Sequence, residues 1–173
     1  MTTLLLVRHG ETDWNADGRL QGQTDRPLSK FGRRQAQRLA DELAAEQLVA
    51  IYSSDLARAR ETAEIVGTRV GLPVTFDPDL REKDWGTWEG LTAVERDRVE
   101  FAGESTEAHQ DRILRALRRI SDSHPAGGSV LVVTHGGSMR RVQTAAMGMA
   151  LPVVENCGRW LCAYENGSFR ALD

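Results

Sequence analysis

Short apolar runs alternate along the chain with longer segments in which apolar residues recur at helical spacing. Short runs are typical of buried strands, and a spacing of three and four residues is typical of amphipathic helices. We therefore expect strands at residues 3–7, 49–53, 74–76 and 129–134, with 74–76 at an edge of the sheet. Two later runs, 160–164 and 168–172, are separated by an Asn-Gly pair, which predicts a closing hairpin.

Four segments between these runs carry the helical pattern. The first covers residues 29–46 and places its apolar side chains on one face. A second helix is expected to run to about residue 69 with Asp55 as its N-cap. A third begins at Ser105, and a fourth covers about residues 138–147. The turn at residues 126–128 leads into the strand between the last two helices.

Strands that alternate with helices predict an α/β domain with a largely parallel sheet. No repeat or linker divides the 173 residues, so we expect a single domain over residues 1–173. The chain is 40% hydrophobic and 27% charged, which is ordinary for a globular protein. Ligands of such sheets bind beyond the carboxyl ends of the strands, so the residues after each strand are the first candidates for a site.

The charge balance argues against two classes of partner. A formal net charge of −3 gives no electrostatic basis for binding nucleic acid or an anionic membrane. The N-terminal apolar run is too short for a signal peptide, and no stretch approaches the length of a membrane span. We therefore expect a cytoplasmic protein. Cys157 and Cys162 are expected to be a buried, reduced pair, because a metal site needs more ligands.

Histidines directly follow two of the predicted strands. His9 follows the first strand, after Arg8, and His135 follows the strand at 129–134. Arg58 lies near the start of the helix after the second strand, and Glu82 lies in the loop after the third. Because the carboxyl ends of parallel strands meet at one edge of the sheet, these side chains can come together.

Arginine and glycine at these positions suit a phosphoryl group. Arg8 and Arg58 keep their charge and can make planar, bidentate contacts to phosphate oxygens. Gly10, Gly136 and Gly137 would let backbone amides approach the anion closely. The pattern therefore indicates a phosphate-handling site.

Each candidate has a plainer explanation when it is taken alone. A histidine at a strand end is more often structural, and an arginine early in a helix is usually a solvated surface group. The joint placement favours a site, and competing signals are absent from the sequence. There is no Gly-x-x-x-x-Gly-Lys loop, no dinucleotide fingerprint, no Gly-x-Ser-x-Gly elbow and no clustered metal-ligand pattern. We therefore expect neither a metal nor a cofactor.

Five segments of the chain resemble the histidine phosphatase superfamily, in its phosphoglycerate mutase-like branch. They read LLLVRHGETDWNADGRLQGQTDRPL (4–28), SSDLARARETAE (53–64), LREKDWGTWEG (80–90), GES (103–105) and VVTHGGSMRR (132–141). They follow the order of the family and span nearly the whole chain. The resemblance implies a three-layer α/β/α sandwich with a mostly parallel central sheet.

The same resemblance implies a role for each candidate. His9 matches the nucleophile that becomes phosphorylated, and Glu82 matches the proton donor. The phosphate-binding positions are Arg8, Arg58, His135, Asn15 and Gln21, with a backbone amide of Gly136 or Gly137 as a further donor.

These roles agree with the chemistry of phosphoryl transfer, which depends on positioning and on stabilising charge at the phosphate oxygens. A neutral His9 attacks phosphorus, while Arg8, Arg58 and a protonated His135 offset the charge. Glu82 protonates the leaving oxygen and then activates the water that hydrolyses phospho-His9. One tension is that Glu82 must start with a proton although the cations around it favour the carboxylate. Burial or a neighbouring carboxylate would offset that effect.

The segment between Gly90 and Gly103 departs from the family. It has only twelve residues, whereas related enzymes have a longer helical insertion that covers the active site. We therefore expect a shallow, open site, which favours hydrolysis of the phosphohistidine. Trp85 and Trp88 are expected to pack in the protein rather than to contact substrate, and the role of Glu11 stays open.

Three functions follow from this reading, in decreasing order of support. The first is a phosphomonoesterase acting on a small phosphorylated metabolite. The second is a cofactor-dependent phosphoglycerate mutase, and the third is a non-catalytic module that binds phosphorylated ligands. The natural substrate, and whether the protein forms a homodimer, stay open.

Overall fold

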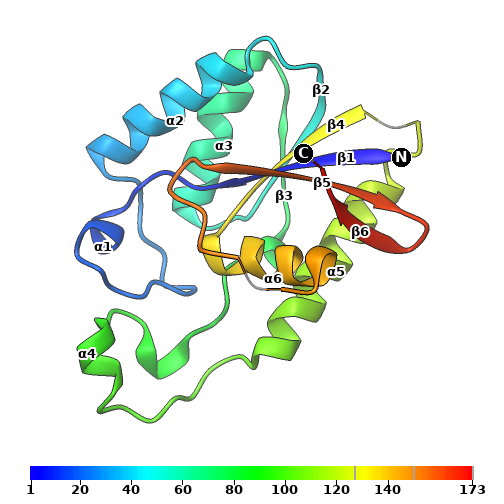
Figure 1. The fold of residues 1–173 in the computed structure, drawn as a ribbon. Helices are drawn as coiled ribbons and strands as arrows, with labels where there is room; N and C mark the ends of the chain where they lie inside the picture. The colour runs from blue at the N-terminus through cyan, green and yellow to red at the C-terminus, as the bar shows by residue number, and fades with distance from the viewer. Residues whose placement is uncertain (127, 150, 173) are drawn as a thin grey trace.

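The computed structural model describes residues 1–126, 128–149 and 151–172. It is built on a six-stranded sheet in the order β3-β2-β4-β1-β5-β6 (Figure 1). The first four strands in this order run parallel, and β5 and β6 add an antiparallel pair at one edge. The strands are β1 (Thr2–Arg8), β2 (Leu48–Ser53), β3 (Val74–Phe76), β4 (Gly128–Thr134), β5 (Arg159–Glu165) and β6 (Ser168–Ala171).

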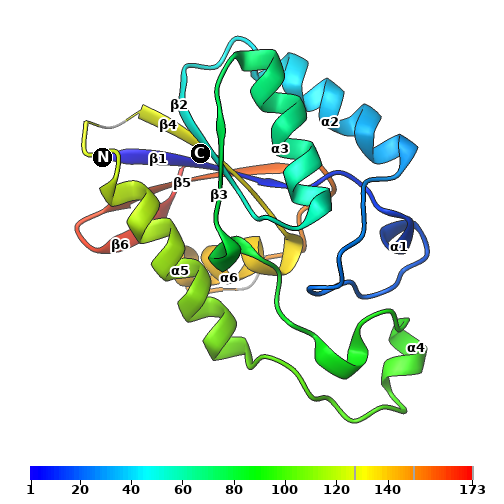
Figure 2. The same ribbon diagram turned by 180° about the vertical axis from the view of Figure 1, so that it is seen from behind.

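Helices cover both faces of the sheet, which confirms the three-layer α/β/α architecture. Leu4 and Leu6 of β1 pack toward α5 and α6, whereas Leu5 and Val7 pack toward α2 and α3. The two pairs of helices lie on opposite sides of the sheet (Figures 1 and 2). The helices are α1 (Asp13–Ala16), α2 (Lys30–Leu43), α3 (Ala57–Val70), α4 (Ala93–Arg96), α5 (Thr106–Asp122) and α6 (Gly136–Met147), with short 3-10 turns η1 (Pro78–Leu80) and η2 (Gly86–Trp88).

Serine caps begin two of the helices where the sequence predicts them. The hydroxyls of Ser29 and Ser105 each accept a backbone N–H three residues further on. The predicted cap at Asp55 is wrong, because α3 begins after Leu56 without a side-chain cap. Asp55 instead forms a two-bond ion pair with Arg81, at 2.7 and 2.6 Å. The carboxylate of Asp55 therefore binds Arg81, which is distant in sequence, and does not cap α3.

The C-terminal elements agree with the predicted pattern. Asn166 and Gly167 have φ values of 52° and 82°, as a tight turn between β5 and β6 requires. Helix α6 begins at Gly136, two residues earlier than predicted. The predicted turn before β4 includes Gly127, which lies outside the described residues. No helix in the described ranges is long and apolar enough to cross a membrane.

Both cysteines are free. Cys162 is buried in the core as expected, whereas Cys157 is only partly buried. Burial raises the pKa of each thiol to about 12, so both are protonated at neutral pH.

Candidate active site

A cavity of about 320 Å³ opens at the carboxyl ends of β1 and β4. Its walls come from the loops after β1 and η1 and from the first turns of α5 and α6. Helices α1 and α4 lie on this side of the molecule (Figures 1 and 2). The candidate residues that line the cavity are Arg8, His9, Asn15, Gln21, Arg58, Glu82, Gly136 and Gly137.

His9 presents an unprotonated nitrogen to this cavity. Its side chain is 3% exposed, and its Nδ1 lies 2.7 Å from the carbonyl oxygen of Gly10. Because a carbonyl only accepts, Nδ1 carries the proton and Nε2 keeps its lone pair. Burial, with the charges of Arg58 and Arg8, lowers the pKa of His9 well below 6.5. The ring is therefore neutral at neutral pH.

Gly10 supports His9 from behind the cavity. Its own N–H donates to Oγ1 of Thr62 at 3.0 Å, so this amide does not point at a bound anion as the sequence suggested. A Cβ at Gly10 would lie 2.6 Å from the carbonyl oxygen of Gly32. The glycine is therefore needed because the chain here packs directly against α2.

Two arginines are held rigidly by carbonyl oxygens. Arg58 is 1% exposed and donates to the carbonyls of Gly22 at 2.6 Å and Thr24 at 3.1 Å. Burial lowers the pKa of Arg58 to about 10, so it still carries its charge at neutral pH. Arg8 donates to the carbonyl of Val154 at 2.8 Å. Both guanidinium groups are fixed in place before any ligand binds.

Glu89 holds the loop that supplies the carbonyls for Arg58. Its carboxylate accepts the N–H groups of Gln23 at 2.8 Å, Thr24 at 2.7 Å and Trp85 at 3.1 Å. The sequence gives no signal of this role, because two of the partners of Glu89 lie 66 and 65 residues away along the chain. Glu89 therefore positions Arg58 indirectly, through the loop between them.

His135 lies beside His9 but not on the cavity surface. The ring centroids are 5.2 Å apart, and Nε2 of His135 lies 2.9 Å from Oγ of Ser54. Its Nδ1 is buried and, within the described residues, has no hydrogen-bond partner. Burial, together with the charge of Arg58, lowers the pKa of His135 well below 6.5. The expected protonated His135 is therefore neutral here, because nearby positive charge opposes its protonation.

Two side-chain amides are oriented by the loop after β1. The hydroxyl of Thr12 donates to Oε1 of Gln21 at 2.9 Å. Oδ1 of Asn15 accepts the N–H of Thr12 at 3.1 Å and a side-chain N–H of Asn156 at 3.3 Å. With both oxygens engaged, the NH₂ groups of Asn15 and Gln21 are the ends that can donate to an anion in the cavity.

The carboxylate of Glu82 faces the same cavity. Its Oε1 accepts the N–H of Lys83 at 2.8 Å, and its Oε2 accepts the N–H of Gly137 at 2.8 Å. The amide of Gly137 therefore binds the carboxylate rather than the expected phosphate. Gly136 keeps its place on the cavity wall.

Comparison with known proteins now decides the family. The histidine phosphatase superfamily (branch 1) model matches residues 4–171. The chain belongs to this superfamily. It is 41% identical over 162 residues to phosphoglycerate mutase-like protein 4 from Arabidopsis thaliana, which covers 83% of this chain and 70% of that protein. It is 38% identical over 161 residues to the metal-independent phosphoserine phosphatase of the same plant, covering 82% and 67%. The solved structure of Bacillus stearothermophilus YhfR superposes with a TM-score of 0.90 at 35% identity, covering 99% and 95%.

This histidine phosphatase carries a buried histidine beside the candidate acid that sequence reasoning missed. Nε2 of His109 lies 3.0 Å from Oγ of Ser138 and 3.7 Å from Oε1 of Glu82. Burial lowers the pKa of His109, although the carboxylate of Glu82 acts in the opposite direction. The signal in the sequence was a polar residue on the apolar face of α5, four positions before Ile113.

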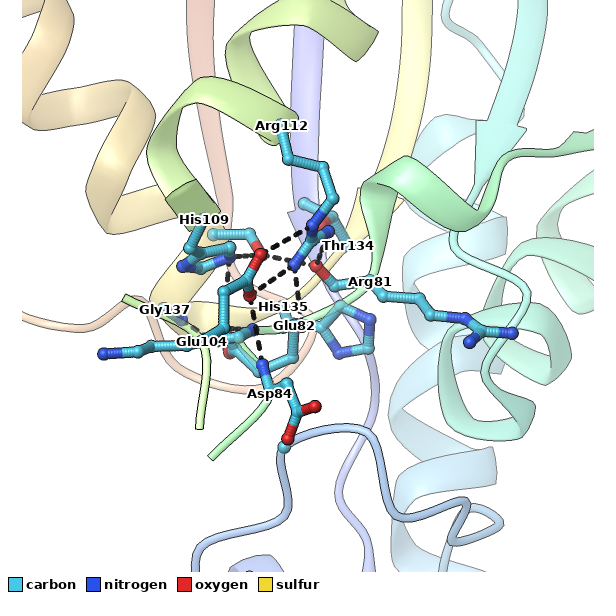
Figure 3. A network of polar contacts seen from close by, with 12 residues as sticks. Arg81, Glu82, Asp84, Glu104, His109, Arg112, Thr134, His135 and Gly137 are labelled. Atoms are coloured by element: carbon cyan, nitrogen blue, oxygen red, sulfur yellow. Dashed lines mark hydrogen bonds and ion pairs between the residues drawn. The ribbon is translucent and has the colours of Figure 1, made fainter. Parts of the chain in front are cut away.

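Arg112 fixes the loop on which Glu82 stands (Figure 3). Its guanidinium donates to the carbonyls of Asp79 and Arg81, both at 2.9 Å, and of Glu82 at 3.2 Å. The same group pairs with both carboxylate oxygens of Glu104, at 3.0 and 2.8 Å. This network keeps the backbone of the acid in one place.

The segment over the site is as short as the sequence predicts. Between Gly90 and Gly103 it forms one four-residue helix, α4. Trp88 packs as expected, stacked on Trp85 with centroids 6.2 Å apart, but Trp85 also reaches the cavity wall. Within the three described ranges, no three His, Cys, Asp or Glu side chains group together so that they could hold a metal ion.

Proposed function

We propose that this histidine phosphatase is a phosphomonoesterase that hydrolyses a small phosphorylated metabolite through a phosphohistidine on His9. The observation that carries the proposal is the hydrogen bond from Nδ1 of His9 to the carbonyl of Gly10. It leaves the lone pair of Nε2 free beside the partly buried Arg8 and the fully buried Arg58. A neutral nucleophile next to fixed positive charge is what attack on a phosphoryl dianion requires.

In the first step, Nε2 of His9 forms a bond to phosphorus as the ester P–O bond breaks. The electron pair of that bond goes to the leaving oxygen, and Glu82 supplies the proton that this oxygen needs. Arg8 and Arg58 stabilise the charge on the equatorial oxygens. Further donors to these oxygens are Asn15, Gln21 and the backbone amide of Gly136, whereas His135 lies beside His9 off the cavity surface.

In the second step, water attacks the phosphorus of phospho-His9. The carboxylate of Glu82 accepts a proton from the water, the P–N bond breaks, and its electron pair returns to Nε2. Orthophosphate leaves, and Glu82 regains its proton for the next cycle. The arginines provide the positive charge in both steps, so we propose that the reaction is metal-independent.

The short α4 segment supports hydrolysis over mutase transfer. A mutase must keep its phosphohistidine away from water until the phosphoryl group returns to the substrate. Incubation with 3-phosphoglycerate separates the two activities. Orthophosphate is the expected product, whereas 2-phosphoglycerate would show a mutase.

Trapping the intermediate tests the covalent step. After rapid mixing with p-nitrophenyl phosphate and a basic quench, mass spectrometry should find one phosphoryl group on His9. His9→Ala should lose both this label and steady-state turnover. Glu11→Gln is the control, because Glu11 bonds to Ser29 outside the cavity. Substantial turnover by His9→Ala would refute the mechanism.

A further inference from the structure

The cavity is strongly basic although the chain has a net charge of −3. Among its lining residues, Glu82 is the single carboxylate. Two of the cations, Arg8 and Arg58, already balance a phosphoryl dianion in the proposed mechanism. The six cations on the cavity wall are Arg8, Arg19, Arg58, Lys83, Arg140 and Arg141.

Among the described residues, the buried ammonium group of Lys83 has no anionic partner. Lys83 is only 8% exposed, and its Nζ lies 3.2 Å from Oγ1 of Thr106. The same atom lies 4.4 Å from the ring centroid of Trp85 and 5.0 Å from that of Phe101. Across the described parts of the chain, no carboxylate pairs with Lys83. Aromatic rings and a hydroxyl offset only part of the cost of burying a charge, so this site favours an anion.

Two consecutive arginines of α6 also have no ion-pair partner in the part of the chain that the structure describes. As far as the structure describes the chain, neither Arg140 nor Arg141 forms an ion pair, and Nε of Arg140 is buried without a partner. Arg19 differs, because it donates to the carbonyl of Gly90 at 2.7 Å and pairs with Glu95 at 3.5 Å. Three cations of the wall are therefore left over: Lys83, Arg140 and Arg141, called here the outer cations.

We propose that the outer cations bind a second anionic group of the substrate, a carboxylate or a second phosphate. This inference rests on the proposed function, since it assigns the phosphoryl group to His9 and its arginines. A phosphate ester of a neutral alcohol or of a neutral sugar would leave the charges of the three outer cations unbalanced. A cavity of about 320 Å³ is small for a metabolite site, so the two anionic groups must be joined by a short skeleton.

The outer cations also come from elements that the short cap leaves exposed to the cavity. Lys83 stands directly after Glu82, and Arg140 and Arg141 lie on the second turn of α6. None of them belongs to the segment around α4. Recognition of the second anion therefore depends on the sheet-edge loops and α6 rather than on a covering insertion.

Matched pairs of substrates test this proposal directly. The first pair is 3-phosphoglycerate and glycerol 3-phosphate, which differ in a carboxylate against a neutral CH₂OH. The second pair is fructose 1,6-bisphosphate and fructose 6-phosphate, which differ in a second phosphate. We expect kcat/KM to favour the doubly anionic member of at least one pair by about 10- to 100-fold, the range for a hydrogen bond to a charged group. The pair that responds identifies the second anion.

Variants assign the preference to the outer cations. Lys83→Met and Arg141→Met should each lower the within-pair ratio of kcat/KM by at least about tenfold, mainly through KM for the doubly anionic substrate. Arg69→Met is the control, because Arg69 pairs with Asp41 on the surface far from the cavity lining. If the buried Lys83→Met variant fails to fold, the more exposed Arg141→Met carries the same test.

The outcomes separate this inference from the proposed function. Turnover of p-nitrophenyl phosphate with ratios below about twofold in both pairs would overturn the second anion site and leave the phosphatase intact. Within-pair ratios of kcat/KM that stay unchanged in both Lys83→Met and Arg141→Met would also overturn the second anion site and leave the phosphatase intact. If no ester is hydrolysed, the proposed function fails, and calorimetric binding of 3-phosphoglycerate and glycerol 3-phosphate then decides the site. Equal affinities there would overturn it.

Discussion

The amide N–H of Gly137 donates to Oε2 of Glu82 at 2.8 Å, and a Cβ on Gly137 would lie 2.4 Å from Oε1 of the same carboxylate. The first turn of α6 therefore holds the candidate acid and leaves no room for a side chain. The backbone N–H of Lys83 binds the other oxygen of the carboxylate at 2.8 Å, so both oxygens are held in place. The imidazole of His109 is also close to this carboxylate, with its Nε2 3.7 Å from Oε1.

Gly137→Ala should displace the carboxylate of Glu82 without changing its chemistry. We expect kcat/KM for alkyl phosphates to fall by about 10- to 100-fold, a part of the 10²–10⁴ that general acid catalysis contributes. The kcat/KM for p-nitrophenyl phosphate should fall much less, because its leaving group needs no proton and the later hydrolysis of phospho-His9 does not enter kcat/KM. Gly148→Ala at the far end of α6 is the control, since its φ of 70° affects stability alone. Equal losses on both substrates would contradict the prediction.

Glu82→Gln should make the rate depend steeply on the leaving group. The amide keeps the size of the side chain but cannot give up a proton as an acid. We expect kcat/KM to fall by about 10²–10⁴ for alkyl phosphates and by less than about tenfold for nitrophenyl phosphates. A series of phenyl phosphates with graded leaving-group pKa measures the slope. An unchanged slope would argue that Glu82 is not the proton donor.

Arg112→Met should destabilise the protein more than an ordinary surface charge change does. The substitution removes the guanidinium group, which donates both to the carboxylate of Glu104 and to three carbonyls of the loop that carries Glu82. Removing one partner of a largely buried pair costs about 3–5 kcal/mol, and urea unfolding measures the change. Arg119→Met is the control, because its side chain is 54% exposed and should cost about 1 kcal/mol or less. Similar losses for the two variants would refute a special role for Arg112.

Stability should fall as the solution is acidified below about pH 6.5, the ordinary pKa of histidine. Burial lowers the pKa of His9, His135 and His109 in the folded protein. In this pH window the unfolded chain binds protons that the native protein does not, so the free energy of unfolding rises with pH. Each such histidine contributes up to about 1.4 kcal/mol per pH unit, and the contribution is fully present above about pH 6.5.

Urea unfolding at pH 7.5 and 5.5 measures this slope. His9→Asn and His135→Asn should each flatten it, because the substituted residue has no proton to bind. His124→Asn is the comparison, since this histidine is outside the cavity lining and bonds to Tyr52. A slope that no buried-histidine variant changes would show that carboxylates alone control acid stability.

Much of the fold follows from local pattern. The run in β1 is apolar at every position from Leu4 to Val7, which is typical of a strand covered on both faces. Serines at 29 and 105 mark helix starts, and Asn166-Gly167 marks the hairpin. These features depend on neighbours in the chain, which is why sequence predicts them. The prediction of a helix start is wrong where a distant residue binds the expected capping side chain, as Arg81 binds Asp55.

Some features of the candidate site also follow from the sequence, whereas others are seen only in the structure. That His9, Arg58 and Glu82 meet follows from their positions after parallel strands. Their roles stay predictions, as do the single domain over residues 1–173 and the cytoplasmic location. The contacts of Glu89 and His109 could not be predicted, because each partner lies in a segment that only folding brings close.

By itself the sequence determined the family, the layered fold that the family resemblance implies, and the set of residues at the sheet edge, since the ends of the strands follow from local pattern. The order of the strands in the sheet came only from the structure. Tertiary structure alone decided their chemical states. His9 and His135 are neutral because the folded chain removes them from water and places Arg58 beside them. Burial and charge at close range depend on atoms from distant segments, and no local pattern encodes those distances.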